Sequence, residues 1–98
     1  MYRIFRVPAG QAGKIDALLK DEVVSRQSLV VREARSLGIE GEGTLVLVEG
    51  SEAGLAQAEA LLKDAGKALI GAEAENAYRR FKAQDEDAVS GMGLIFGP

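Results

Sequence analysis

The chain has 98 residues, of which 47% are hydrophobic and 28% charged, and its formal net charge is −3. This length suits a single domain, and the negative charge provides no basic surface of the kind that nucleic acid selects. The sequence contains neither cysteine nor histidine, which excludes disulfides, zinc–thiolate sites, thiol nucleophiles and histidine-based catalysis. We therefore expect no metal and no cofactor.

The first part of the chain alternates extended and helical patterns. Residues 2–7 are aromatic, β-branched or long, as strands favour, and Pro8 ends this strand because proline has no N–H for a sheet ladder. Residues 9–13 form a loop of small residues, and residues 14–24 place apolar side chains at helical spacing. A second strand is predicted over residues 29–35.

The middle of the chain repeats this alternation. Glycines in the segment 37–43 predict a turn into a third strand, residues 44–49. Ser51 is a suitable N-cap for a helix that runs to about residue 65, and Gly66 is a suitable residue to end it.

The last part of the chain predicts one more strand and one more helix. The strand runs from residue 67 to residue 70 or 71, and the helix covers roughly residues 72–88. Ser90 and Gly91 are predicted to break the helix, and the short apolar tail that follows, residues 92–98, is expected to dock as an added strand.

The element order of strand, helix, strand, strand, helix and strand is the split βαβ arrangement of ferredoxin-like domains. We therefore predict an α+β fold, ferredoxin-like βαββαβ, with an antiparallel sheet in the order 4-1-3-2 or a close variant. Both core helices are expected on one face of the sheet, followed by a C-terminal helix and apolar tail. Residues 1–98 are expected to form one domain, with a core over 1–71 and an extension over 72–98.

Both faces of the predicted sheet are apolar. The strands 2–7 and 44–49 carry large apolar side chains at both alternating sets of positions, whereas two helices would cover only one face. A second subunit, the C-terminal extension or a ligand would have to cover the other face. Aromatic residues make up only 5% of the chain, so we expect a thin core stabilised by homo-oligomerisation. The predicted interface residues are Val46, Leu47, Leu94, Ile95 and Phe96.

A ligand site is predicted at the loop 9–13. Backbone N–H groups at the start of a helix suit a carboxylate or phosphate, and arginines on the first two strands are suited to bind the same anion. The alternatives are a tight turn that binds nothing and, for the arginines, a network of salt bridges with Glu33, Glu49 or a partner subunit. The predicted ligand-binding residues are Gly10, Gln11, Gly13, Arg6 and Arg35.

Two further patterns favour structural interpretations. The consecutive acids at 85–87 point in different directions, which predicts a solvated helix end rather than a calcium site. Tyr78 and Phe81 share the apolar face of the last helix and Arg79 and Arg80 lie outside it, which predicts core packing rather than stacking on nucleic-acid bases.

The segments GTLVLVEGSEA (43–53) and AEALLKDAG (58–66) resemble the second half of NIL-type domains, which are ACT-like ferredoxin folds. The opening IFRVPAG (4–10) is similar to the family's first strand and loop. The resemblance implies a regulatory module that binds amino acids or other small ligands, often at subunit interfaces near the first strand-to-helix loop. The extra helix and tail depart from that pattern.

We therefore expect a non-enzymatic small-ligand-binding, regulatory or scaffolding domain that acts as a homo-oligomer and binds a small carboxylate-bearing ligand. One alternative is a dimeric α+β barrel enzyme that uses Tyr, Arg, Asp or Glu chemistry. Another is an assembly partner whose tail inserts into another protein. No apolar run is long enough for a signal peptide or a spanning helix, so we expect a cytoplasmic protein with neither nucleic acid nor membrane as partner.

Overall fold

The computed structural model describes the backbone of residues 1–96 and the side chains of residues 1–84. Four strands and three helices make up the fold, with three short 3₁₀ turns between them. The strands are β1 (Tyr2–Val7), β2 (Ser28–Glu33), β3 (Thr44–Glu49) and β4 (Lys67–Ala68). The helices are α1 (Gly13–Lys20), α2 (Glu52–Leu61) and α3 (Gly71–Phe96), and the turns are η1 (Ala9–Gln11), η2 (Val24–Arg26) and η3 (Ala34–Leu37).

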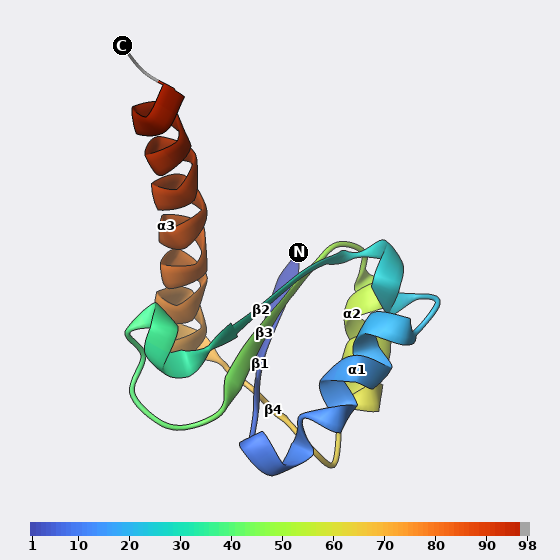
Figure 1. The fold of residues 1–98 in the computed structure, drawn as a ribbon. Helices are drawn as coiled ribbons and strands as arrows, with labels where there is room; N and C mark the ends of the chain where they lie inside the picture. The colour runs from blue at the N-terminus through green and yellow to red at the C-terminus, as the bar shows by residue number, and fades with distance from the viewer. Residues whose placement is uncertain (97–98) are drawn as a thin grey trace.

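The strands form one antiparallel sheet in the order β2-β3-β1-β4 (Figure 1). Read from the β4 edge, the same order is β4-β1-β3-β2. In the register of the central pair, Ile4 of β1 lies opposite Leu47 of β3, and Phe5 lies opposite Val46. The α+β class and the antiparallel sheet that the sequence predicted are confirmed.

A separate apolar core lies on each face of the sheet. On one face, Phe5 and Val46 pack under α1 and α2; on the other, Ile4 and Leu47 pack under η3 and the first turns of α3. Figure 1 shows α1 and α2 on one side of the strands and α3 on the other. The sequence left three possibilities for what covers the second face: a second subunit, a ligand or the C-terminal extension. In the structure the C-terminal extension covers it, through α3.

Polar side chains near the start of α2 join it to the end of η2. Ser51 is the N-cap, since its Oγ accepts a hydrogen bond from the Gly54 N–H at 3.2 Å. The Gln27 Oε1 accepts the Ser51 N–H at 2.9 Å, and its Nε2 donates to the Val23 carbonyl at 3.1 Å. A methyl group at Gly54 would overlap the Gln27 side chain, so a larger residue at position 54 would have to displace Gln27 from these hydrogen bonds.

Two backbone carbonyls on the outer edge of β2 accept hydrogen bonds from nearby side chains of the same chain. The Ala34 N–H donates to the Gly43 carbonyl on the β3 side, and backbone groups alternate in direction along an antiparallel strand. The carbonyls of Val31 and Glu33 therefore point outward, away from β3. Arg32 Nη1 donates to the first at 2.8 Å, and Ser36 Oγ donates to the second at 2.9 Å.

Several predicted element boundaries are wrong. The first helix ends at Lys20 because Asp21 has an extended backbone and its Oδ1 accepts the N–H groups of Val23 and Val24. The second strand ends at Glu33, since η3 follows it and closes at Gly38 with φ 72°. β4 has only two residues before the chain turns into α3 at Gly71, where φ is 59°.

The second core helix also ends earlier than predicted, at Leu61. The last helix, in contrast, runs past Ser90 and Gly91 to Phe96, so the predicted break and the strand-like tail are wrong. A glycine inside a helix costs only about 1 kcal/mol, whereas proline costs about 3 kcal/mol, and the first proline after Pro8 is Pro98. The predicted docking contacts of Leu94, Ile95 and Phe96 lie outside the described side chains.

Candidate functional site

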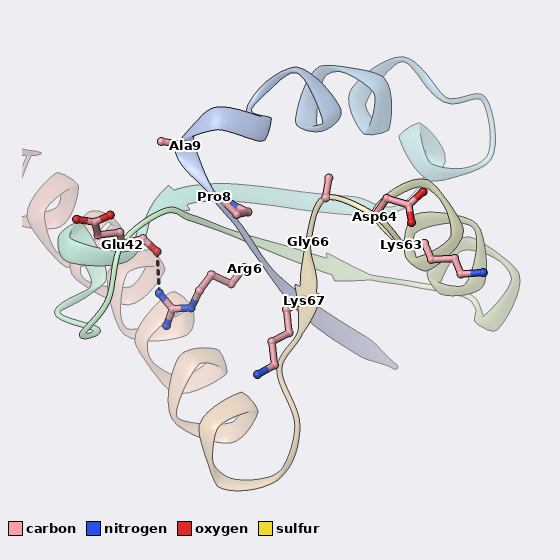
Figure 2. A pocket seen from close by; sticks show the side chains of 9 residues that line it. Arg6, Pro8, Ala9, Glu42, Lys63, Asp64, Gly66 and Lys67 are labelled. Atoms are coloured by element: carbon pink, nitrogen blue, oxygen red, sulfur yellow. Dashed lines mark hydrogen bonds between the residues drawn. The ribbon is translucent and has the colours of Figure 1, made fainter.

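A cleft of about 430 Å³ lies where β1 ends and β4 begins, between the β1–α1 loop and the α2–β4 connection (Figure 2). We call it the Arg6–Lys67 cleft. Its charged lining residues are Arg6, Glu42, Lys63, Asp64 and Lys67, and its small or apolar ones are Pro8, Ala9, Ala65 and Gly66.

Two cations stand side by side at this cleft. Arg6 of β1 and Lys67 of β4 occupy directly opposite positions in the antiparallel register, so their side chains leave the same face of the sheet. Figure 2 shows both pointing to the same side of the strands, whereas Lys63 extends away from them. Like charges at opposite positions repel, and within the described part of the chain neither residue forms a salt bridge.

Arg6 also holds the loop that joins η3 to β3. Its Nη1 donates to the Glu42 carbonyl at 3.0 Å, drawn as the dashed line in Figure 2, and its Nη2 donates to the Glu40 carbonyl at 3.2 Å. The guanidinium thus binds backbone oxygens rather than the carboxylate of either glutamate. Its positive charge therefore stays without an ionic partner among the described side chains.

The structure brings only part of the predicted ligand site together. Arg6 lines the cleft, as do Pro8 and Ala9 from the predicted loop. Gly10 and Gln11 lie in η1, Gly13 begins α1, and none of these three lines the cleft. The space beside the Cα atoms of Gly10 and Gly13 is open to a distance of 4 Å.

Arg35 lies in a neighbouring cleft of about 300 Å³ instead. Its Nε is 3.7 Å from a carboxylate oxygen of Glu33, and the Arg35 side chain is 89% exposed. This contact matches the alternative that the sequence offered for the arginines, a salt bridge with Glu33. Arg3 likewise pairs with Glu59 of α2 at 3.0 Å.

The predicted interface residues of β3 lie inside the chain. Val46 and Leu47 are each 1% exposed, and they belong to the cores on opposite faces of the sheet. Their apolar character is therefore explained by packing against α1, α2 and α3 within one protomer.

The sequence reasoning missed Lys63, Lys67 and Gly66. The signal for Lys67 was available in principle, because a fourth strand placed beside the first sets a basic residue next to Arg6. Placing Lys67 opposite Arg6 requires the register between β1 and β4, and the sequence of a two-residue strand does not reveal that register. Lys63 and Gly66 lie in the connection before β4, whose path depends on where α2 ends.

A second polar cluster fastens α3 to the sheet. The Tyr78 hydroxyl donates to one Glu49 carboxylate oxygen at 3.0 Å, and the Lys82 Nζ donates to the other at 2.7 Å. The Lys82 hydrogen bond lowers the pKa of Glu49, and the bond to the Glu49 carboxylate raises the pKa of Tyr78. Tyr78 also stacks on Tyr2 and Phe81 is 2% exposed, which confirms the predicted packing role of both aromatics.

Asp21, at the end of α1, also has a shifted pKa. The Val24 N–H and the Gln57 side-chain amide hydrogen-bond its carboxylate and lower its pKa. These bonds connect the end of α1 to η2 and α2. Asp21 therefore has a structural role, and it does not line the Arg6–Lys67 cleft.

Among the described side chains, no group of three acidic residues gathers in a way that would hold a metal ion. The acids at 85–87 lie outside those side chains. Of the described helices, none combines the length and apolar character that a bilayer-spanning segment needs.

Comparison of the chain with protein-family models, with curated proteins and with solved structures gave no match. The resemblance to NIL-type domains stays an expectation. Interpretation of the Arg6–Lys67 cleft therefore depends on the residues that line it.

Proposed function

We propose that this protein is a non-enzymatic domain that binds a small carboxylate-bearing ligand in the Arg6–Lys67 cleft. The observation that carries the proposal is the pair of cations at opposite positions of β1 and β4. Their repulsion costs stability in the free protein, and an anion placed between them replaces it with charge-assisted hydrogen bonds.

The size and charge of the cleft support the same ligand class. A volume of about 430 Å³ falls within the range of small-molecule sites. Three cationic and two acidic residues line it, a local balance of +1 in a chain whose net charge is −3. The apolar wall formed by Pro8, Ala9 and Ala65 suits the carbon skeleton of a small organic acid.

A binding role fits the described residues better than catalysis. Within residues 1–84, the pKa values of Asp21, Glu49 and Tyr78 are shifted, and none of these three groups lines the cleft. A dimeric α+β barrel enzyme would also need an open sheet face to meet its partner. In this chain α3 and η3 cover that face.

We further propose that the fold is ferredoxin-like, on the basis of the strand order read from β4 and of α1 and α2 lying on one face. Homo-oligomerisation stays a prediction. The expectation came from the thin core and from the apolar second face of the sheet, and α3 covers that face within the protomer. Light scattering at tens of micromolar will measure the mass.

Calorimetric titration with succinate and citrate tests the binding proposal. A ligand present at 100 times its Kd should also raise the free energy of unfolding by about 2.7 kcal/mol. Lys67→Gln should weaken binding by roughly ten- to a hundredfold, since a hydrogen bond to a charged group contributes roughly 1.5–3 kcal/mol. Lys14→Gln, which removes an exposed cation from α1, is the matched control. Equal affinity of both variants, or no binding of either acid, would overturn the proposal.

A further inference from the structure

Arg6 belongs to two parts of the molecule at once. It lines the Arg6–Lys67 cleft, and its guanidinium holds the carbonyls of Glu40 and Glu42. Gly41 lies between these two residues with φ 101°, and a Cβ atom there would come within 2.8 Å of the Arg6 Nη1. The segment 40–42 is therefore wrapped closely around the guanidinium.

Few other contacts hold this segment. At its beginning, the Gly38 N–H donates to the Arg35 carbonyl and the Ile39 N–H donates to the Ala34 carbonyl. At its end, the Gly43 carbonyl accepts the Ala34 N–H. Within the described part of the chain, residues 40–42 make no hydrogen bond except those to Arg6. Positive-φ glycines at 38, 41 and 43 add to the entropy that ordering this segment costs.

We propose that Arg6 couples ligand binding in the cleft to the order of the segment 40–42. This inference rests on the proposed function. Two of the five guanidinium N–H groups hold the carbonyls, and all five share one rigid plane. A carboxylate bound as a bidentate pair beside Lys67 forms the stronger bonds, so it turns this plane toward the cleft and away from the two neutral carbonyls. Ligand binding thus withdraws the donors that order the segment, and the segment loosens.

Loosening the segment 40–42 would also change the shape of the neighbouring cleft. Gly41, Glu42 and Gly43 form one wall of the neighbouring cleft, in which Arg35 and Glu33 also lie. Glu42 and Ala9 line both clefts. The presence of the ligand is therefore transmitted from the Arg6–Lys67 cleft to the surface around Arg35, through a segment only three residues long.

Citrate titration followed by NMR separates the two proposals. Chemical-shift changes at the amides of Gly66 and Lys67 report binding, and ¹⁵N-relaxation order parameters of residues 40–42 report the order of the segment. In the wild-type chain we expect citrate to shift the resonances of Gly66 and Lys67 and to lower the order parameters of residues 40–42 from about 0.85 to below about 0.6, the values of rigid and flexible backbone. The order parameter of Ala58 in α2 is the internal control.

Arg6→Lys is the decisive variant. Lysine keeps the positive charge at the cleft, but a single ammonium cannot reproduce the planar fork that holds both carbonyls. We expect residues 40–42 of the ligand-free variant to have order parameters as low as those of citrate-bound wild type, and to show no further change at a citrate concentration that saturates the variant. Lys67→Gln should leave the order parameters of the ligand-free segment as in wild type.

The outcomes are distinguishable. If citrate shifts the resonances of Gly66 and Lys67 but leaves the order parameters of residues 40–42 unchanged, the coupling is overturned and the binding proposal stands. A segment 40–42 that is as ordered in ligand-free Arg6→Lys as in ligand-free wild type would also overturn the coupling. If citrate moves no resonance of the cleft, the binding proposal fails and the coupling fails with it.

Discussion

Tyr2 at the start of β1 and Tyr78 on α3 stack face to face, with ring centroids 4.1 Å apart and ring planes inclined by 21°. The hydroxyl of Tyr78 and the ammonium of Lys82 bind the two oxygens of the Glu49 carboxylate. One turn of α3 is thereby joined to two neighbouring strands. This junction positions the helix over the second apolar face of the sheet.

Removing the Tyr78 ring should weaken the domain more than removing its hydroxyl. Tyr78→Phe keeps the stack and loses one hydrogen bond, so we expect a loss of about 1 kcal/mol in the free energy of unfolding. Tyr78→Ala loses the stack as well, and we expect a loss of about 3 kcal/mol. Urea unfolding measures both. Arg79→Ala, an exposed neighbour, should change stability by less than about 0.5 kcal/mol.

The stabilising effect of Glu49 should depend on pH. Its pKa in the folded protein lies below the ordinary value of 4.5, so its contribution is complete above that value and is lost as the pH falls through the folded pKa. Glu49→Gln should therefore be less stable than wild type at pH 7, and this difference should shrink by pH 3. Urea unfolding at the two pH values tests this, and a constant difference would contradict it.

Reversing the charge at position 67 should stabilise the free protein and abolish binding. Lys67→Glu replaces a repulsive cross-strand pair with an attractive one, which we expect to raise the free energy of unfolding by about 0.5–1 kcal/mol. The new carboxylate repels the proposed ligand. Thermal melting with and without citrate measures both effects. Lys14→Glu controls for the change in net charge, and a destabilised Lys67→Glu that still binds citrate would contradict the interpretation.

Gly54→Ala should destabilise the protein although alanine is the better helix former. The added methyl group displaces the Gln27 side chain, which breaks its hydrogen bond to the Ser51 N–H. We expect a net loss of about 1–2 kcal/mol.

Gly13→Ala at the start of α1 is the matched control for Gly54→Ala, because nothing lies within 4 Å of the added atom. It should gain about 0.4–1 kcal/mol. Combining Gly54→Ala with Gln27→Ala should recover part of the loss. If the double variant shows no recovery, the steric explanation is wrong.

The parts of the fold that depend on local patterns were predictable. The apolar residues of β1 and β3 at both alternating positions predicted two buried faces, and Ser51 predicted the start of α2. The pattern did not show that α3 covers the second face. An apolar residue indicates that its position is buried, but it does not indicate which segment packs against it. The end of α1 was missed because it depends on two hydrogen bonds to the Asp21 side chain.

The candidate site was predictable only in part. Arg6 was singled out because arginines suit anions, and it does line the cleft. Its neighbour Lys67 depends on a register between strands that are distant in the sequence, and its contacts with Glu40 and Glu42 depend on the path of a glycine-rich loop. Such long-range relationships leave no periodic signal in the chain.

The outer edge of β2 has a consequence for the behaviour of the protein in concentrated solution. An arriving strand needs acceptors as well as donors, and the outward carbonyls of Val31 and Glu33 are already engaged by Arg32 and Ser36. Exposed strand edges promote sheet-to-sheet aggregation unless charges or other devices block them. Arg32 places a positive charge at this edge and also binds the Val31 carbonyl. A strand that added to β2 at these two carbonyls would first have to break the hydrogen bonds from Arg32 and Ser36.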